Sequence, residues 1–71
     1  MPTARATLAE NLKHLRAERG MSQEDLALEA ELHRTFVAHV ERASRNISLD
    51  NIEKLAKALG IPTHVLLTPR S

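Results

Sequence analysis

The chain has 71 residues, no cysteine, a single aromatic residue and a formal net charge of +1 at neutral pH. That length suits one small domain over residues 1–71, and the lack of cysteine excludes a disulfide framework or a thiolate metal site. With Phe36 as its only aromatic residue, the chain favours an all-α bundle over a sheet. No apolar run approaches the roughly 20 residues of a membrane span and no signal peptide is evident, so we expect a cytoplasmic, nucleoid-associated protein.

Hydrophobic periodicity predicts five helices and no strand, with an ordered core over about residues 6–68. The first helix, about residues 6–19, carries an apolar stripe of Leu8, Leu12 and Leu15, and Gly20 fits the left-handed position that follows a helix. Ser22 is a strong N-cap for a second helix that ends near residue 30. Acidic residues in its first turn agree with the helix dipole.

The third helix is predicted over about residues 33–42 and is followed by a polar loop at 43–47. Ser48 then caps a fourth helix over 49–59, which Gly60 terminates. Pro62 suits the first turn of a short fifth helix.

The second and third helices together have the pattern of a helix-turn-helix unit. Ala27 supplies the small residue that two crossing helices need, and Leu32 closes the turn between them. Val37 and Val40 point to the core, so helical geometry turns the opposite side of the third helix outward. The residues on that side are the candidate base readers Arg34, Thr35, Ala38 and His39.

These residue types fit the major groove of DNA. Arg34 can bind guanine through two hydrogen bonds, and Thr35 and His39 can hydrogen-bond base edges. Ala38 permits close approach or contact with a thymine methyl group.

Phosphate contacts are expected on both sides of this helix. Gln23 and the backbone N–H groups at the start of the second helix attract anions, and a basic loop follows the third helix. Residues 22–31 hold four acids and no lysine or arginine, whereas residues 33–46 hold three arginines and one acid. The candidate phosphate contacts are Ser22, Gln23, His33, Phe36, Arg42, Arg45 and Asn46.

Three segments carry a family resemblance: LKHLRAERGMSQEDLA, HRTFVAHVER and SLDNIEKLAKALGIP. The chain resembles the phage repressor and Cro-type (XRE-like) helix-turn-helix family, most of all the controller proteins of restriction–modification systems. The resemblance implies a lambda repressor-like fold of five helices that binds palindromic operators as a homodimer. It also implies that Gln23 clamps a phosphate and that Arg16 and Glu41 form a structural ion pair.

The sequence departs from the family pattern at three positions. Glu31 and Ala43 stand where glycine is frequent, and Ile47 stands where proline often precedes the serine cap. If both glycine positions keep a left-handed backbone, each non-glycine residue costs about 1–2 kcal/mol. Otherwise the turn adjusts and the pose of the recognition helix changes.

Several roles stay open at this stage. Arg34 is either a DNA contact or a solvated arginine, and Thr35 is either a base reader or a helix filler. His33 either contacts a phosphate or leads into the helix, and Phe36 either pads the core edge or presses on the DNA. The four histidines lack metal-ligand spacing, so we expect no metal, no cofactor and no enzyme activity.

The C-terminal segment is more apolar than a short helix needs for its own packing. The candidate dimer-interface residues are Ile61, His64, Val65, Leu66 and Leu67. The alternative is that they cap the core of the monomer.

The sequence thus predicts a DNA-binding transcription regulator, repressor or activator, that binds double-stranded DNA and controls its own expression. RNA polymerase is a further candidate partner, through the acidic second helix. The alternative is an antitoxin-type protein-interaction module that acts mainly through a protein partner.

Overall fold

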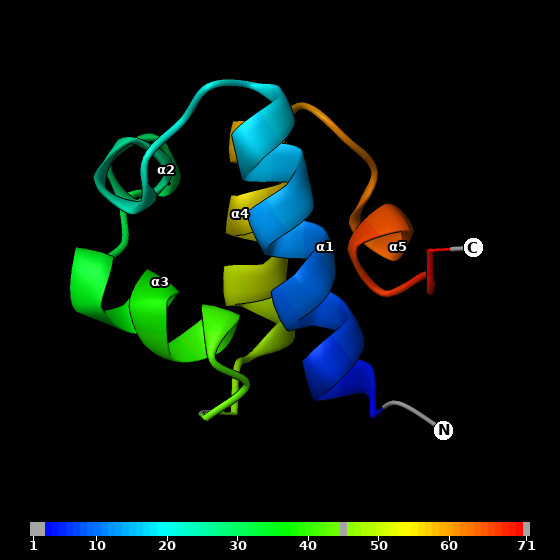
Figure 1. Ribbon diagram of the computed structural model, residues 1–71. Helices are drawn as coiled ribbons and strands as arrows, with labels where there is room; N and C mark the ends of the chain where they lie inside the picture. Colours follow the sequence, from blue (N-terminus) through cyan, green and yellow to red (C-terminus); the bar gives the residue numbers. More distant parts are fainter. Residues whose placement is uncertain (1–2, 45, 71) are drawn as a thin grey trace.

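The computed structural model describes residues 3–44 and 46–70, and these form five helices without a strand (Figure 1). The helices are α1 (Ala4–Glu18), α2 (Gln23–Ala30), α3 (Arg34–Glu41), α4 (Leu49–Leu59) and α5 (Thr63–Leu66). The predicted all-α, five-helix fold is confirmed. The predicted bounds agree to within two residues, and the main difference is that α1 begins at Ala4, where the Thr3 hydroxyl accepts a hydrogen bond from Ala6 N.

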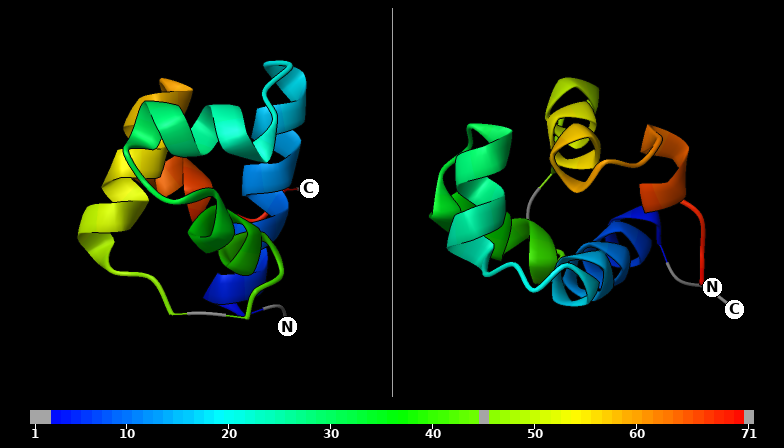
Figure 2. Two further views of the ribbon diagram at one scale, coloured as in Figure 1. Left: turned by 90° about the vertical axis from the view of Figure 1, so that its left-hand side faces the viewer. Right: turned by 90° about the horizontal axis from the view of Figure 1, so that it is seen from above.

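The helices surround one aliphatic core. Seen from above, α1 and α4 face each other, α2 and α3 lie on one side and α5 lies on the opposite side (Figure 2). The apolar stripes that the sequence predicts all point into this core. Its largest fully buried side chains are Leu8, Leu12, Leu26, Leu55, Leu66, Val37 and Val40.

Serine caps and left-handed residues set where the helices begin and end. Ser22 and Ser48 cap α2 and α4, because each hydroxyl accepts a hydrogen bond from the backbone N–H three residues later. Gly60 ends α4 with a φ of 72°, as predicted for a glycine after a helix. These local signals explain why the sequence places the helices correctly.

A buried amide attaches α5 to α1, a contact that apolar spacing does not predict. Asn11 is only 2% exposed. Its Nδ2 donates to the carbonyls of Leu66 and Thr68, both at 2.9 Å, and more weakly to that of Val65 at 3.3 Å. Asn11 thereby satisfies carbonyls that α5 leaves unpaired at its C-terminal end.

Candidate nucleic-acid interface

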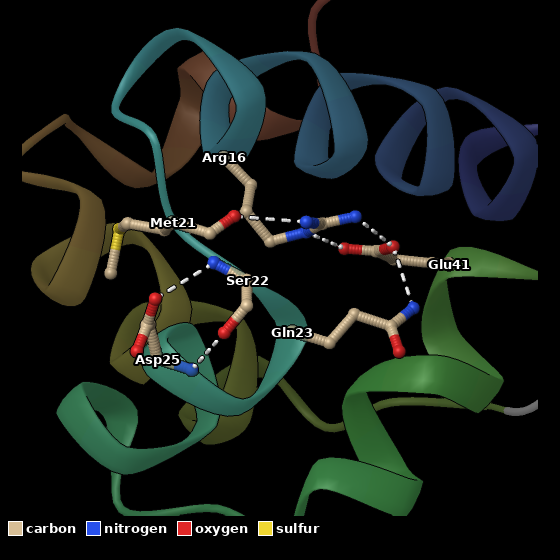
Figure 3. A network of polar contacts seen from close by, with 6 residues as sticks. All are labelled: Arg16, Met21, Ser22, Gln23, Asp25 and Glu41. Carbon is tan, nitrogen blue, oxygen red and sulfur yellow. Dashed lines mark hydrogen bonds and ion pairs between the residues drawn. The ribbon is translucent and has the colours of Figure 1, made fainter.

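The first turn of α2 is fixed by a reciprocal pair of hydrogen bonds. The Ser22 hydroxyl accepts from Asp25 N at 2.9 Å, and the Asp25 carboxylate accepts from Ser22 N at 2.9 Å (Figure 3). This is a capping box. The hydrogen bond from the Ser22 backbone lowers the pKa of Asp25, and the Ser22 side chain adds to that effect.

The turn between α2 and α3 keeps the geometry for which the family usually employs glycine. Glu31 has a φ of 59°, and Leu32 N donates to Ala27 O at 2.8 Å across the turn. Ala43, after α3, has a φ of 55°. Both departures therefore occupy left-handed positions, and each costs about 1–2 kcal/mol relative to a relaxed backbone. The turn does not adjust to avoid the strain.

The core anchors α3 along one side only. Val37, Val40 and Glu41 are buried, with Val37 completely so. At about 100° per residue, the direction opposite these three falls on Thr35, between Ala38 and His39. Arg34 and Thr35 are exposed, and Ala38 and His39 are half-buried. The candidate base readers Thr35, Ala38 and His39 thus lie on the outward side of α3. Arg34 falls on the same angular side as the buried Glu41 and is exposed as the first residue of the helix.

A charged network joins α1, α2 and α3 (Figure 3). Arg16 donates from Nε to Glu41 Oε2 at 2.8 Å and from Nη2 to Glu41 Oε1 at 3.0 Å, while its Nη1 reaches the Met21 carbonyl at 2.9 Å. The Glu41 side chain is 3% exposed and the Arg16 side chain 21%. The hydrogen bond to Glu41 raises the pKa of Arg16. The ion pair implied by the resemblance is present and fixes α3 against α1.

Gln23 belongs to the same network. Its Nε2 donates to Glu41 Oε1 at 3.0 Å, and Figure 3 shows the side chain reaching from the first turn of α2 toward α3. One amide hydrogen is therefore held by the buried carboxylate, and the other is left to donate elsewhere. Gln23 is oriented by Glu41 at the edge of the recognition helix, where the resemblance implies a phosphate clamp.

The end of α3 holds a second polar cluster, formed by His39, Arg42 and Ser44. Arg42 donates from Nη2 to His39 Nδ1 at 3.0 Å. The Ser44 hydroxyl donates to the His39 carbonyl at 3.0 Å and lies 3.4 Å from the same ring nitrogen. Arg42, a candidate phosphate contact, therefore also touches a candidate base reader.

The other candidate phosphate contacts differ in how exposed they are. His33 is the exposed N-cap of α3 and makes no side-chain capping bond. Phe36 is half-buried: it packs on the core edge and also lines an open groove with Thr35 and His39. Asn46 is exposed and accepts a hydrogen bond from Arg5. Arg45 lies outside the described residues.

Three residues near this surface were not predicted from the sequence. Arg5 adds a positive charge beside Asn46, Ser44 contacts His39, and Asn51 of α4 lines the groove with Thr35 and His39. The first turn of α1 is far from α3 in sequence, and a loop separates α3 from α4, so periodicity alone does not bring these turns beside α3. A basic residue in the first turn of α1, where the dipole disfavours it, was the available signal for Arg5.

The structure corrects one of the candidate dimer residues. Leu66 is completely buried in the core of its own protomer, so its side chain is not available to a partner. Ile61 and Val65 are half-buried, His64 is exposed and Leu67 is 37% exposed. The alternative that these residues cap the monomer core therefore holds for Leu66.

The described residues show two further absences. Within 3–44 and 46–70, no cluster of three or more His, Asp or Glu side chains is placed to hold a metal ion. Over the same residues, no helix has the length and apolar character needed to cross a membrane.

Comparison with known proteins gives the family. Residues 12–66 match the helix-turn-helix family model. Control protein C.BamHI of Bacillus amyloliquefaciens is 60% identical over 47 residues, which cover 66% of this chain and 58% of that protein. A hypothetical transcription factor of Neisseria meningitidis is 51% identical over 65 residues, which cover 92% of this chain and 61% of that protein. This chain therefore spans about three fifths of the length of these two relatives.

Solved structures of similar proteins have the same fold. The crystal structure of the hypothetical transcription factor NHTF from Neisseria has a TM-score of 0.91 and 47% identity, and the match covers 97% of this chain and 83% of that one. The restriction–modification controller protein C.Esp1396I, solved as a tetramer with its natural 35 base-pair operator, has a TM-score of 0.83 and 33% identity over 93% of this chain and 87% of that one. The predicted resemblance is confirmed: the chain belongs to the helix-turn-helix family, and its relatives include control proteins of restriction–modification systems.

Proposed function

We propose that the chain is a sequence-specific DNA-binding transcription regulator that reads the major groove with α3. The observation that carries this proposal is the outward side of α3, where Thr35, Ala38 and His39 stand on a helix whose other side is buried, with Arg34 exposed at its first position. The capped first turn of α2 lies beside it with Gln23, as a phosphate site requires. The operator complex of C.Esp1396I supports the same kind of ligand.

A gel shift with DNA from upstream of the chain's own gene tests this proposal and the proposed control of its own expression. We expect a shift that unrelated DNA at the same salt concentration does not compete away. Replacing Arg34 by Ala should weaken specific binding about 5- to 150-fold, because a good bidentate contact to guanine is worth about 1–3 kcal/mol. Lys57→Ala, in the last turn of α4, removes the same charge away from α3 and serves as the control.

If unrelated DNA competes equally well, or if the Lys57 variant loses as much affinity as the Arg34 variant, the proposed specific reading by α3 is wrong. A two-step shift is expected when two protomers bind two half-sites. Half-sites one DNA turn apart would place one α3 in each successive major groove.

We further propose that the surface of α5 forms the homodimer contact, through Ile61, His64, Val65 and Leu67. Leu67 is 37% exposed, and a partner surface would remove that apolar area from water. Leu67→Asp should shift the protein toward monomer in sedimentation and weaken operator binding more than binding to a single half-site. Leu28→Asp, the same change at an 80% exposed leucine of α2, should leave the dimer intact; equal effects of the two changes would exclude this interface.

The exposed side of α2 favours a protein partner in addition to DNA. Leu28 is 80% exposed, and Glu24, Asp25 and Glu29 surround it on the same side of the helix. This surface is where we propose contact with RNA polymerase, and it is also what a protein-interaction module would employ. In transcription with purified polymerase, Leu28→Asp should change promoter output while leaving operator affinity unchanged; unchanged output would leave α2 an ordinary solvated helix.

A further inference from the structure

The side chain of His39 is held in one protonation pattern by its neighbours. Arg42 Nη2 lies 3.0 Å from His39 Nδ1. A guanidinium group stays charged and has only donors, so the ring nitrogen that faces it has to present its lone pair. A neutral imidazole carries one proton, and that proton therefore sits on Nε2.

Ser44 makes only a long contact with the ring. Its hydroxyl donates to the His39 carbonyl at 3.0 Å, and its oxygen lies 3.4 Å from Nδ1. The hydroxyl proton is thus committed to the backbone, and Arg42, at 3.0 Å, is the donor that Nδ1 faces. Arg42 directly follows α3, so the end of the helix orients its own candidate base reader.

The other ring nitrogen, Nε2, makes no hydrogen bond with residues 3–44 and 46–70. His39 is half-buried and lines the groove with Asn51 and with Thr35, one helical turn earlier. Thr35 stands in the N-terminal turn of α3, the part of such a helix that contacts base edges, and His39 lies on the same side of the helix. What it offers there is an N–H donor.

We propose that Arg42 holds His39 as a donor at Nε2, so that His39 rejects cytosine at the base edge it faces. Guanine, adenine and thymine each present an acceptor in the major groove, whereas the cytosine edge presents only a donor. A side chain that only donates therefore disfavours cytosine relative to the other three bases. This inference rests on the proposed function, and it makes Arg42 a positioning residue as well as a phosphate contact, since a guanidinium has five N–H groups.

Selection from a pool of randomised duplexes tests the proposal. The full chain should select half-sites with a preference against cytosine at one base position, where introducing cytosine costs about tenfold in affinity, the order of one hydrogen bond to a base edge. In the His39→Ala variant this preference should disappear at that base pair alone. His39→Gln is a second variant, and because an amide both donates and accepts, it should tolerate cytosine at that position almost as well as the other bases.

Two measurements separate the positioning role of Arg42 from simple phosphate binding: the overall affinity for DNA and the base preference at the position that His39 faces. Loss of a phosphate contact weakens all operators by the same factor, whereas loss of positioning flattens the preference at the one base pair that His39 faces. Arg42→Gln should therefore reduce the preference against cytosine, and Arg42→Lys, which restores a donor-only group, should recover it. Nitrogen NMR of the His39 ring should show the proton on Nε2 in the unchanged protein and a mixture of the two neutral tautomers in Arg42→Gln, because an amide both donates and accepts.

The results distinguish a failure of the proposed function from a failure of the inference about His39. If no sequence is selected at all, the proposed function itself is wrong. If a sequence is selected but neither His39 variant alters the preference at any base pair, or if the ring proton lies on Nδ1, only the inference about His39 is overturned.

Discussion

Two regions of the molecule share α1 as their support but are attached to it by different chemistry. Residues 22–44, the reading half, are tied to α1 by a charged pair, in which Arg16 reaches the buried Glu41. Residues 46–70, which we call the docking half after the proposed dimer contact, are tied to it by hydrogen bonds to carbonyl groups. The neutral Asn11 amide donates to Leu66 and Thr68, and Arg19, the C-cap of α1, donates from Nε to Leu59 at 2.9 Å. A buried charge is costly to leave unpaired, whereas a neutral amide costs less. The reading half therefore depends more strongly on Arg16 than the docking half depends on Asn11.

The reading half also has the more strained backbone. The left-handed positions of the reading half are occupied by Glu31 and Ala43, and that of the docking half by Gly60. Only glycine adopts this backbone without penalty. Strain and buried charge thus gather around the recognition helix, which is common where function rather than stability sets the geometry.

The largest expected effect removes the cation of the charged pair. Arg16→Leu leaves the Glu41 carboxylate buried with Gln23 as its remaining side-chain partner, so we expect a loss of about 3–5 kcal/mol in the free energy of unfolding, measured with urea. The double variant Arg16→Leu, Glu41→Leu removes the unpaired charge as well and should recover much of that loss. Equal destabilisation of the single and double variants would show that the charge itself is not the cause.

The docking half should be destabilised when a charge is introduced at Asn11. Asn11→Asp replaces a donor by a carboxylate against the carbonyls of Leu66 and Thr68, with an expected loss of about 2–3 kcal/mol. Hydrogen exchange should show lost protection in α5, while α3 keeps its own. The same change at Asn51, in the first turn of α4, should be neutral or slightly stabilising because a carboxylate there meets the helix dipole. Uniform loss of protection in both halves would contradict their separate attachment.

The strained turns give an effect of smaller size and opposite sign. Ala43→Gly should raise the free energy of unfolding by about 1 kcal/mol, which for a domain of this size raises Tm by about 4–8 °C. Gly60→Ala should lower it by a similar amount, since a Cβ there meets no atom within 4 Å and only the φ of 72° is unfavourable. If Ala43→Gly lowers Tm instead, the left-handed backbone at Ala43 is not a source of strain.

The smallest effect lies in the capping box of α2. The pKa of Asp25 is lowered below its ordinary value of 3.8, chiefly by the backbone hydrogen bond from Ser22. Its stabilisation is therefore fully present above that ordinary value and is lost as the pH falls through the folded-state pKa. The gap in stability between the unchanged protein and Asp25→Asn should be open at pH 6 and closed at low pH. Asp50→Asn, in the first turn of α4, is the matched control, and an equal pH dependence there would assign the effect to the helix dipole instead of the box.

The sequence predicts the fold well where the signals are local. Apolar spacing, Ser22 and Ser48 as caps and Gly60 as a terminator give five helices with nearly correct bounds. The same spacing of Val37 and Val40 predicts which side of α3 faces outward. These features depend on neighbouring residues alone.

The errors come from contacts between distant segments. Leu66 was expected at a dimer surface because an apolar residue in a short terminal helix has the same pattern whether it faces a partner or its own core. Asn11 was missed although it lies on the apolar side of α1, three residues after Leu8 and four before Leu15. A polar residue inside an apolar stripe signals a buried polar contact, but its partner is not readable from the stripe.

The hydrogen bonds of Asn11 also set the order in which the domain can be completed. They join residues that are 54 to 57 positions apart, so the ribosome releases the donor long before its acceptors exist. Contacts of such sequence separation slow folding, because loop-closure entropy opposes them. A nascent chain that stops before Leu66 lacks the two carbonyls that pair most closely with the amide and the Leu66 side chain that is buried in the core. The domain can therefore close only after residues 66–68 have been synthesised.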